Sequence, residues 1–308
     1  ICPDTTGISL FPLLEDAIYE IDEDSGEIEF AWYPCEHFEE MGFDDVAKEG
    51  IMNYASSAFA GLLGVAGPPY VERTDWTHIN AVSYLGPNKY YKNGKDQRFH
   101  PDNIMFDSRT NNLIAIIARH PGEYKGESWD AGAIVWKVGP EYKFEEADIG
   151  HINGPHSAHM IPKGLPGAGN ILVFDNGGVA GYGSLLPGLP GYYPNVFRDY
   201  SRSVEFNPVT LEKVWEYKQT EGSDAGGNYE RKFYSMLISN TQRLPNGNTL
   251  ICEGQTGRIF EVNKKGEIVW EYISEYSNGF PLGPAGFLGP RPVYRAYRVP
   301  QTWVKKYL

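Results

Sequence analysis

The chain has 308 residues, of which 41% are hydrophobic, 22% are charged and 14% are aromatic, with 35 glycines and 22 prolines. This composition supplies a large apolar core and many turns, and it excludes a disordered, collagen-like or coiled-coil chain. The formal net charge of −13 provides no general field for phosphate backbones, so we expect no nucleic-acid partner.

The first predicted element is a β-hairpin near the N-terminus. Residues 18–22 and 28–33 alternate polar and apolar side chains on either side of an Asp-Ser-Gly turn, which is typical of two short antiparallel strands. The chain begins at Ile1 without a basic or apolar leader. We expect that a targeting peptide has been removed or was never included. The sequence leaves open whether a further structural unit lies upstream. Pairing of Cys2 with Cys35 is one arrangement that the three cysteines allow, without the sequence deciding it.

Residues 36–64 interrupt the strand pattern with helical spacing and few turn residues, so we predict a partly helical insertion there. The weakly polar stretch at 55–69 is shorter than the roughly 20 apolar residues that cross a bilayer. We therefore expect a soluble protein without a membrane span. Further along, residues 177–195 are rich in Gly, Pro and Tyr, and we expect a long ordered loop that shapes a binding face.

Later segments repeat the first hairpin. Residues 204–207 with 214–217, and residues 259–263 with 268–272, match almost position by position, and 133–137 is a half-copy. A turn followed by a buried strand precedes them at 161–173 and 244–251, and more faintly at 112–116. Trp215 and Trp270 lie 55 residues apart, and Trp32 and Trp136 lie 104 apart, or two units of about 52.

A repeat of about 50 residues with four strands is typical of a β-propeller. The length allows about six such units, so we predict one all-β domain over residues 1–308, a six-bladed propeller, with a pair of β-sandwiches as the alternative. We expect residues 293–299 to close the ring by sharing a blade with residues 7–10.

All histidines lie before residue 160: His37, His78, His100, His120, His151, His156 and His159. Several precede expected strands within polar segments. In a propeller, residues that enter equivalent innermost strands converge on one end of the central channel, so we expect imidazoles to meet there. The Pro162 and Pro245 turns place His156 and Ser239 at the same blade position and align His159 with Gln242. We expect His120 and His151 to be hydrogen-bonded rim residues.

Convergent imidazoles support three chemistries. They can ligate a transition metal, act as general acid or base, or attack a phosphoryl or sulfuryl group as a nucleophile. A nucleophile also needs a cation for the developing oxygen charge, and Arg202 is the candidate. Our candidate catalytic residues are thus His156, His78 and Arg202, and the candidate substrate-binding residues are His159, Asn80, Asn176, Ser239 and His100. We assign no metal ligand and no cofactor.

Several motifs together resemble the arylsulfate sulfotransferase family. They are DWTHIN at 75–80, FHPDN at 99–103, HMIPKG at 159–164 leading to DNG at 175–177, YSR at 200–202 and QRLPNGN at 242–248. The resemblance spans about residues 15–275. It implies a secreted or periplasmic six-bladed propeller that moves a sulfuryl group between phenols without a nucleotide cofactor, through a sulfated histidine in the channel.

By this resemblance, His78, His156 and Arg202 occupy positions whose side chains bind the sulfuryl oxygens in the family. The family's nucleophilic histidine comes from a later blade, where this chain has none and where Ser239 or Asn240 stands nearest. Neither replaces an imidazole nucleophile without an activating base. Either a retained histidine such as His156 is the nucleophile, or the channel performs another reaction or only binds.

Three hypotheses follow. The leading one is a secreted, periplasmic or cell-surface arylsulfotransferase-like propeller, which transfers a sulfuryl group or binds an aromatic or anionic small molecule through His and Arg. The alternative is a non-catalytic extracellular interaction or structural propeller, whose 21 tyrosines offer a surface to a protein partner or a second copy. The third is a metal-dependent lyase or hydrolase with histidine ligands.

Overall fold

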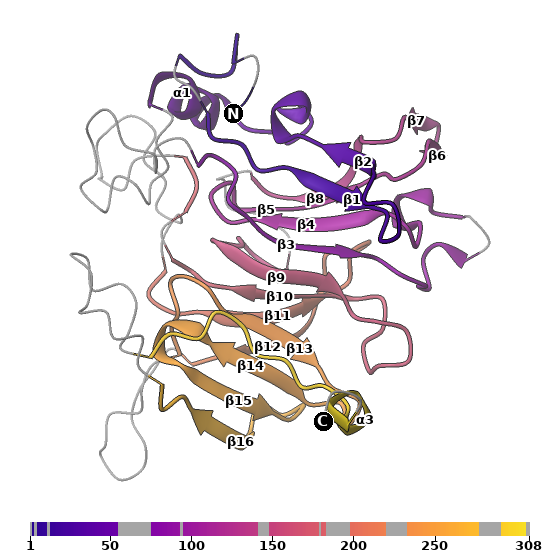
Figure 1. The fold of residues 1–308 in the computed structure, drawn as a ribbon. Helices are drawn as coiled ribbons and strands as arrows, with labels where there is room; N and C mark the ends of the chain where they lie inside the picture. Colours follow the sequence, from indigo (N-terminus) through magenta and orange to yellow (C-terminus); the bar gives the residue numbers. More distant parts are fainter. Residues whose placement is uncertain are drawn as a thin grey trace.

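The structure is a computed structural model that describes residues 2, 5–10, 13–54, 75–92, 95–140, 148–178, 180–182, 198–219, 233–276 and 291–305. Within these ranges the strands form three four-stranded antiparallel sheets and two hairpins, stacked one after another along the molecule (Figure 1). The α-helices there are α1 (Asp45–Tyr54) and the short α3 (Gln301–Lys305). The fold is therefore all-β, as the sequence predicts.

Each four-stranded sheet is a meander in chain order. The first contains β3 (Ile79–Tyr84), β4 (Ile104–Ser108), β5 (Leu113–Ile117) and β8 (Ile134–Val138); the second contains β9 (Pro155–Met160), β10 (Ile171–Asp175), β11 (Arg202–Phe206) and β12 (Lys213–Lys218); the third contains β13 (Asn240–Arg243), β14 (Thr249–Glu253), β15 (Arg258–Val262) and β16 (Ile268–Ile273). The hairpins are β1 (Ile18–Ile21) with β2 (Ile28–Trp32), and β6 (Gly122–Tyr124) with β7 (Glu127–Trp129).

The hairpins expected from the repeated motif are confirmed. Strand β1 pairs with β2, β11 with β12 and β15 with β16, all antiparallel. The two closest copies also share their register, because Glu205 lies opposite Trp215 and Glu261 lies opposite Trp270. Alternating side chains therefore identified these strand pairs correctly.

The core consists of apolar layers between successive sheets. One layer joins the first and second sheets through side chains such as Met105, Ile116 and Val173, and another joins the second and third through Phe174 and Phe260. Strand β9 contacts β3 and β4, and β13 contacts β9 and β10, so the first strands of the three sheets lie together. Meander sheets packed face to face with their first strands adjacent form a propeller-like arrangement.

The predicted repeat length is too short. The first strands β3, β9 and β13 begin at Ile79, Pro155 and Asn240, which are 76 and 85 residues apart. The connections between strands are longer than a repeat of about 52 residues allows. The part of the chain that the structure describes shows three four-stranded sheets and no closed ring. A six-bladed ring and a single domain over the whole chain stay predictions.

Two of the repeated tryptophans, Trp32 and Trp136, have a packing role. The indole N–H of Trp32, at the end of β2, donates to the carbonyl of Gly132 beside the first sheet at 2.9 Å. Trp136 of β8 donates in the same way to the carbonyl of Pro208 in the second sheet at 2.8 Å. Each indole thus buries its ring and satisfies its single donor on the next sheet along the chain.

The connecting segments agree with the sequence in part. Helix α1 confirms helical structure in the 36–64 insertion, whose residues 55–64 lie outside the described ranges, as do 183–195 of the expected long loop. Cys2 and Cys35 form a disulfide, and the remaining Cys252 is buried. Among the described helices, neither is long and apolar enough to cross a membrane.

The expected ring closure by the C-terminal segment is wrong. The backbone N–H of Ser239 donates to Tyr294 O at 3.1 Å, and the side chain of Asn240 accepts from Ala296 N at 2.8 Å. Residues 293–298 therefore lie along β13 of the third sheet (Figure 1). Residues 7–10 lie instead beside α1, where Leu10 N donates to Met52 O at 2.9 Å. Amide side chains on β13 bind the C-terminal segment. The alternation of polar and apolar residues in the sequence does not reveal such contacts.

Gly177 provides a test of backbone crowding. Its φ is +72°, and an added Cβ would overlap the carbonyl oxygen of Tyr200, whereas Gly164, with φ of +95°, has open space around it. We expect Gly164→Ala to lower the free energy of unfolding by about 1 kcal/mol and Gly177→Ala by about 3 kcal/mol or more. Urea unfolding followed by tryptophan fluorescence measures both, and equal losses would contradict the proposed crowding.

Candidate functional site

Polar residues from different sheets meet at one edge, because β4 and β10 end where β3 and β9 begin. Ile79 lies opposite Ser108 in the first sheet, and Pro155 lies opposite Asp175 in the second. The residues that directly precede or follow these positions therefore gather at the same edge. They are His78, Arg109, His156, Asn176 and, beside the third sheet, Ser239.

His156 is held in one tautomer. Its side chain is 1% exposed, and its Nδ1 lies 2.8 Å from Asn176 Oδ1. The Asn176 amide nitrogen donates at 2.7 Å to the carbonyls of both Ser235 and Ile238, which turns the amide oxygen toward the ring. Nδ1 therefore carries the proton and donates it, while Nε2 makes no hydrogen bond with any described residue and keeps its lone pair.

Electrostatics keep this imidazole neutral. Burial, together with the nearby Arg109 guanidinium, lowers the pKa of His156 to about 3. A neutral imidazole with Nδ1–H fixed and Nε2 unprotonated is the form that acts as a base or a nucleophile near neutral pH.

Arg109 is the cation beside His156, and our sequence analysis missed it. It follows β4 and is 2% exposed. Its backbone N–H donates to the backbone carbonyl of His78 at 3.0 Å. A Cβ on Gly154, at the start of the second sheet, would lie 3.7 Å from Arg109 Cγ, so the side chain runs alongside that segment. Burial lowers the pKa of Arg109 to about 10, which still leaves it charged at neutral pH. Its position after β4 matches that of Asn176 after β10, and aligning strand ends would have found it.

His78 and Tyr234 complete the cluster. His78 has φ of 50°, its side chain is 45% exposed, and its Nδ1 lies 2.5 Å from Asp75 Oδ2. After burial and Arg109, His78 also lowers the pKa of His156, so the two side chains are near enough to interact electrostatically. The Tyr234 hydroxyl is buried without a hydrogen-bond partner among the described residues, and burial raises the pKa of Tyr234 to about 12. It is therefore a neutral donor; no pattern in the sequence marked it.

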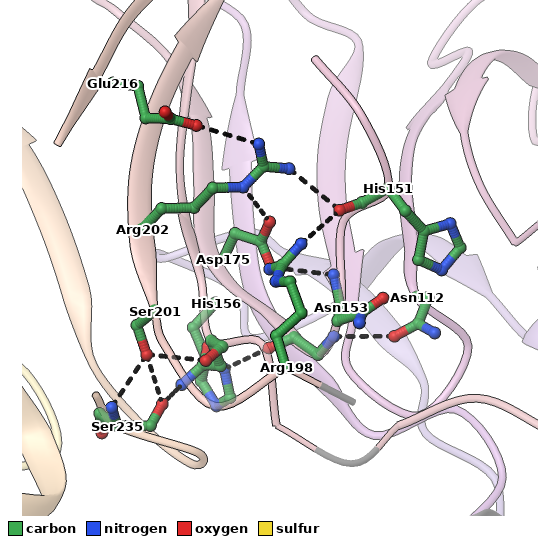
Figure 2. A network of polar contacts seen from close by, with 12 residues as sticks. Asn112, His151, Asn153, His156, Asp175, Arg198, Ser201, Arg202, Glu216 and Ser235 are labelled. Carbon is green, nitrogen blue, oxygen red and sulfur yellow. Dashed lines mark hydrogen bonds and ion pairs between the residues drawn. The ribbon is translucent and has the colours of Figure 1, made fainter. Parts of the chain in front are cut away.

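Arg202 has a different environment from the one we expected. Its Nε donates to Asp175 Oδ2 at 2.7 Å, its Nη1 to Glu216 Oε1 at 3.1 Å and its Nη2 to His151 O at 3.0 Å. Figure 2 shows Arg202 and Arg198 converging on both Asp175 and the His151 carbonyl. All three of its nitrogens thus serve a buried ion-pair cluster, and its expected role as a sulfuryl clamp stays a prediction.

Two other predicted binding residues, Asn80 and His159, lie on the first strands of their sheets, and Ser239 directly precedes β13. Asn80 Nδ2 donates to Pro155 O at 3.2 Å and links β3 to β9. The Ser239 hydroxyl accepts Gly254 N–H at 3.0 Å. His159 Nδ1 donates to Ser157 O at 2.8 Å, and burial lowers the pKa of His159.

The predicted alignment of the sheets holds for one pair only. His159 and Gln242 are equivalent, since they lie opposite Leu172 and Leu250. His156 lies within β9 rather than before it, and β9 carries a one-residue bulge. His156 is therefore equivalent to Asn240, and not to Ser239 as we predicted.

His100 lies apart from this edge. It precedes β4, whereas Arg109 follows β4, and a five-residue strand spans about 16 Å. The structure therefore does not bring His100 together with His78 and His156.

The family model of the arylsulfotransferases (ASST) matches residues 11–276, most of the chain. This chain belongs to the arylsulfotransferase family. No curated protein sequence matches it. A crystal structure of a protein of unknown function from Bacteroides caccae is similar over 85% of this chain and 71% of that chain, with 13% identity and a TM-score of 0.28. That similarity is too low to support an argument about fold or function.

Acid should destabilise this arylsulfotransferase-family protein through the buried His156 and the half-buried His151. Burial lowers the pKa of His156 to about 3 and that of His151 to about 4, while an unfolded histidine has a pKa of about 6.5. Between these values the unfolded chain binds protons that the folded chain excludes, so stability is complete above the unfolded value and falls as pH decreases. From pH 7 to pH 5 each histidine should lower the free energy of unfolding by up to about 2 kcal/mol.

Urea unfolding at pH 7 and pH 5 measures this effect. We expect His156→Gln to reduce the pH-dependent loss by about 2 kcal/mol, and the surface substitution Lys48→Gln to leave it unchanged. An identical pH dependence in His156→Gln and in the unaltered chain would contradict burial of a neutral imidazole.

The Arg202 cluster should contribute to stability. Removing one partner of a buried ion pair leaves uncompensated charge, so we expect Arg202→Gln to lower the free energy of unfolding by about 3–5 kcal/mol. Lys48→Gln, which breaks the exposed ion pair with Glu39, should change it by less than about 1 kcal/mol. Urea unfolding compares the two, and a loss below about 1 kcal/mol for Arg202→Gln would show that the cluster is not structural.

Proposed function

We propose that this protein is a secreted arylsulfotransferase-like β-propeller in which His156 accepts a sulfuryl group from an aryl sulfate and passes it to a phenol. Family membership and the propeller-like sheets support the general class. The Cys2–Cys35 disulfide supports an oxidising, extracytoplasmic location, where such bonds persist. The number of six blades rests on the family resemblance alone.

One observation carries the assignment of the nucleophile. The later-blade histidine of the family is missing, and the residue of the third sheet that is equivalent to His156 is Asn240. His156 itself is neutral, has its Nδ1–H bonded to Asn176, keeps the lone pair on Nε2 and lies near the Arg109 cation. These are the features that an attacking imidazole requires.

The reaction has two displacements. First, the Nε2 lone pair attacks sulfur, the N–S bond forms, and the S–O bond to the aryl group breaks, with its electron pair leaving on the phenolate oxygen. A proton then reaches that oxygen from His78, which Asp75 orients. Next, the oxygen of an acceptor phenol attacks sulfur and gives its proton back to His78. The N–S bond breaks, and its electron pair returns to Nε2.

Arg109 and Tyr234 supply the electrostatic part. The sulfuryl oxygens carry negative charge throughout, and a guanidinium in a buried site stabilises that charge more than it would in water. The Tyr234 hydroxyl, which has no partner among the described residues, is a second donor for these oxygens. Arg202 lies in its ion-pair cluster and contributes by fixing Asp175, the residue before Asn176.

Turnover of a fluorogenic aryl sulfate with a phenol acceptor tests this proposal. We expect His156→Gln to abolish turnover, Arg109→Gln to reduce it about 100–1,000-fold and His78→Gln to reduce it at least about 100-fold. The matched control is His37→Gln, because His37 is also paired with a nearby carboxylate, Glu40 at 2.8 Å, but lies outside the site; it should keep full activity.

A trapping experiment separates the nucleophile from a binding role. Aryl sulfate without acceptor should add the mass of one sulfuryl group to the intact protein, and not to His156→Gln. Turnover that survives in folded His156→Gln would overturn the assignment. Folded wild-type protein that binds the aryl sulfate in calorimetry but does not turn it over would support a non-catalytic binding propeller.

A further inference from the structure

A second histidine cluster lies at the opposite end of the first sheet from His156. Ile104 at the start of β4 lies opposite Ile117 at the end of β5, so the segment before β4 and the segment after β5 run side by side. Asn103 Oδ1 accepts Arg119 N–H at 3.0 Å and ties the two together. This pairing brings His120 next to His100 and Asp102, about 20 residues earlier in the chain.

The donor atoms of this cluster lie at metal-ligand separations. Asp102 Oδ2 is 3.3 Å from His120 Nε2 and 3.7 Å from His100 Nδ1, and the three donor atoms all lie within 4.8 Å of one another. Ligands placed tetrahedrally at about 2.1 Å from Zn²⁺ are about 3.4 Å apart. Small side-chain rotations therefore suffice to place all three donors around one ion.

The local structure holds these ligands in place. Asn103 N donates to His100 O at 2.9 Å, which closes a turn that contains Pro101. The His100 ring packs edge-on against Tyr91, with 4.5 Å between ring centroids. The backbone N–H of Asp102 donates to His100 Nδ1 at 3.2 Å, so Nδ1 carries a lone pair in this tautomer, and metal binding at Nδ1 would replace this hydrogen bond.

We propose that His100, Asp102 and His120 bind a divalent transition-metal ion, with Zn²⁺ as the best match to two imidazoles and one carboxylate. Asp102 and His120 also line an open cleft of about 430 Å³ together with Tyr84. Three protein ligands would leave a tetrahedral ion one position for water or an anion. The site is separate from the His156 cluster, so the proposal stands apart from sulfuryl transfer.

Isothermal titration calorimetry with Zn²⁺ tests the site, on protein freed of its affinity tag and treated with a chelator. We expect one ion per chain, with affinity reduced at least about tenfold in His120→Ala and in Asp102→Asn. His37→Gln is the matched control, because His37 and Glu40 form a histidine–carboxylate pair with no third ligand in the part of the chain that the structure describes; its titration should match that of the unaltered chain. Co²⁺, added in place of Zn²⁺, should give the visible absorption of a tetrahedral site.

Each outcome decides the proposal. His120 and Asp102 have side chains that are 51% and 60% exposed, so these variants should fold, and circular dichroism verifies it. Absence of Zn²⁺ binding in the unaltered chain, or equal affinity in His120→Ala, Asp102→Asn and the unaltered chain, would overturn it.

Discussion

The apolar layers between successive sheets are the constraint on which this structure depends. Strands β4, β10 and β14 are buried along their whole length. Both faces of each strand must therefore be covered by other parts of the protein. Stacking meander sheets face to face provides it. The stacking also sets the first strands side by side, and this arrangement brings the ends of separate sheets together at one edge. The candidate site is thus a consequence of how the core is buried.

Two buried arginines near that edge have different surroundings. Arg202 is surrounded by the carboxylates of Asp175 and Glu216 and by the His151 carbonyl, so its charge is compensated inside the protein. Arg109 lies beside a neutral imidazole, and burial lowers its pKa. Arg202 is therefore committed to the ion-pair cluster, while Arg109 lies next to His156.

Asn176 connects the sheet junction to the chemistry. Its amide nitrogen donates hydrogen bonds to the carbonyls of Ser235 and Ile238, which lie in the segment leading to the third sheet. Its amide oxygen accepts the Nδ1–H of His156. The tautomer of His156 therefore depends on how the second and third sheets are packed. A side chain of this kind relays packing to reactivity without touching a substrate.

The sequence alone determined the all-β class, the repeated hairpins and the concentration of histidines, because alternation, turn residues and composition are local properties of the chain. It did not determine the repeat length, because the lengths of the connections do not follow from strand patterns. Nor did it reveal that Arg109 lies beside His156 or that Arg202 is neutralised by Asp175 and Glu216. Those facts depend on which strand ends the stacked sheets bring together, and only the tertiary structure decides this.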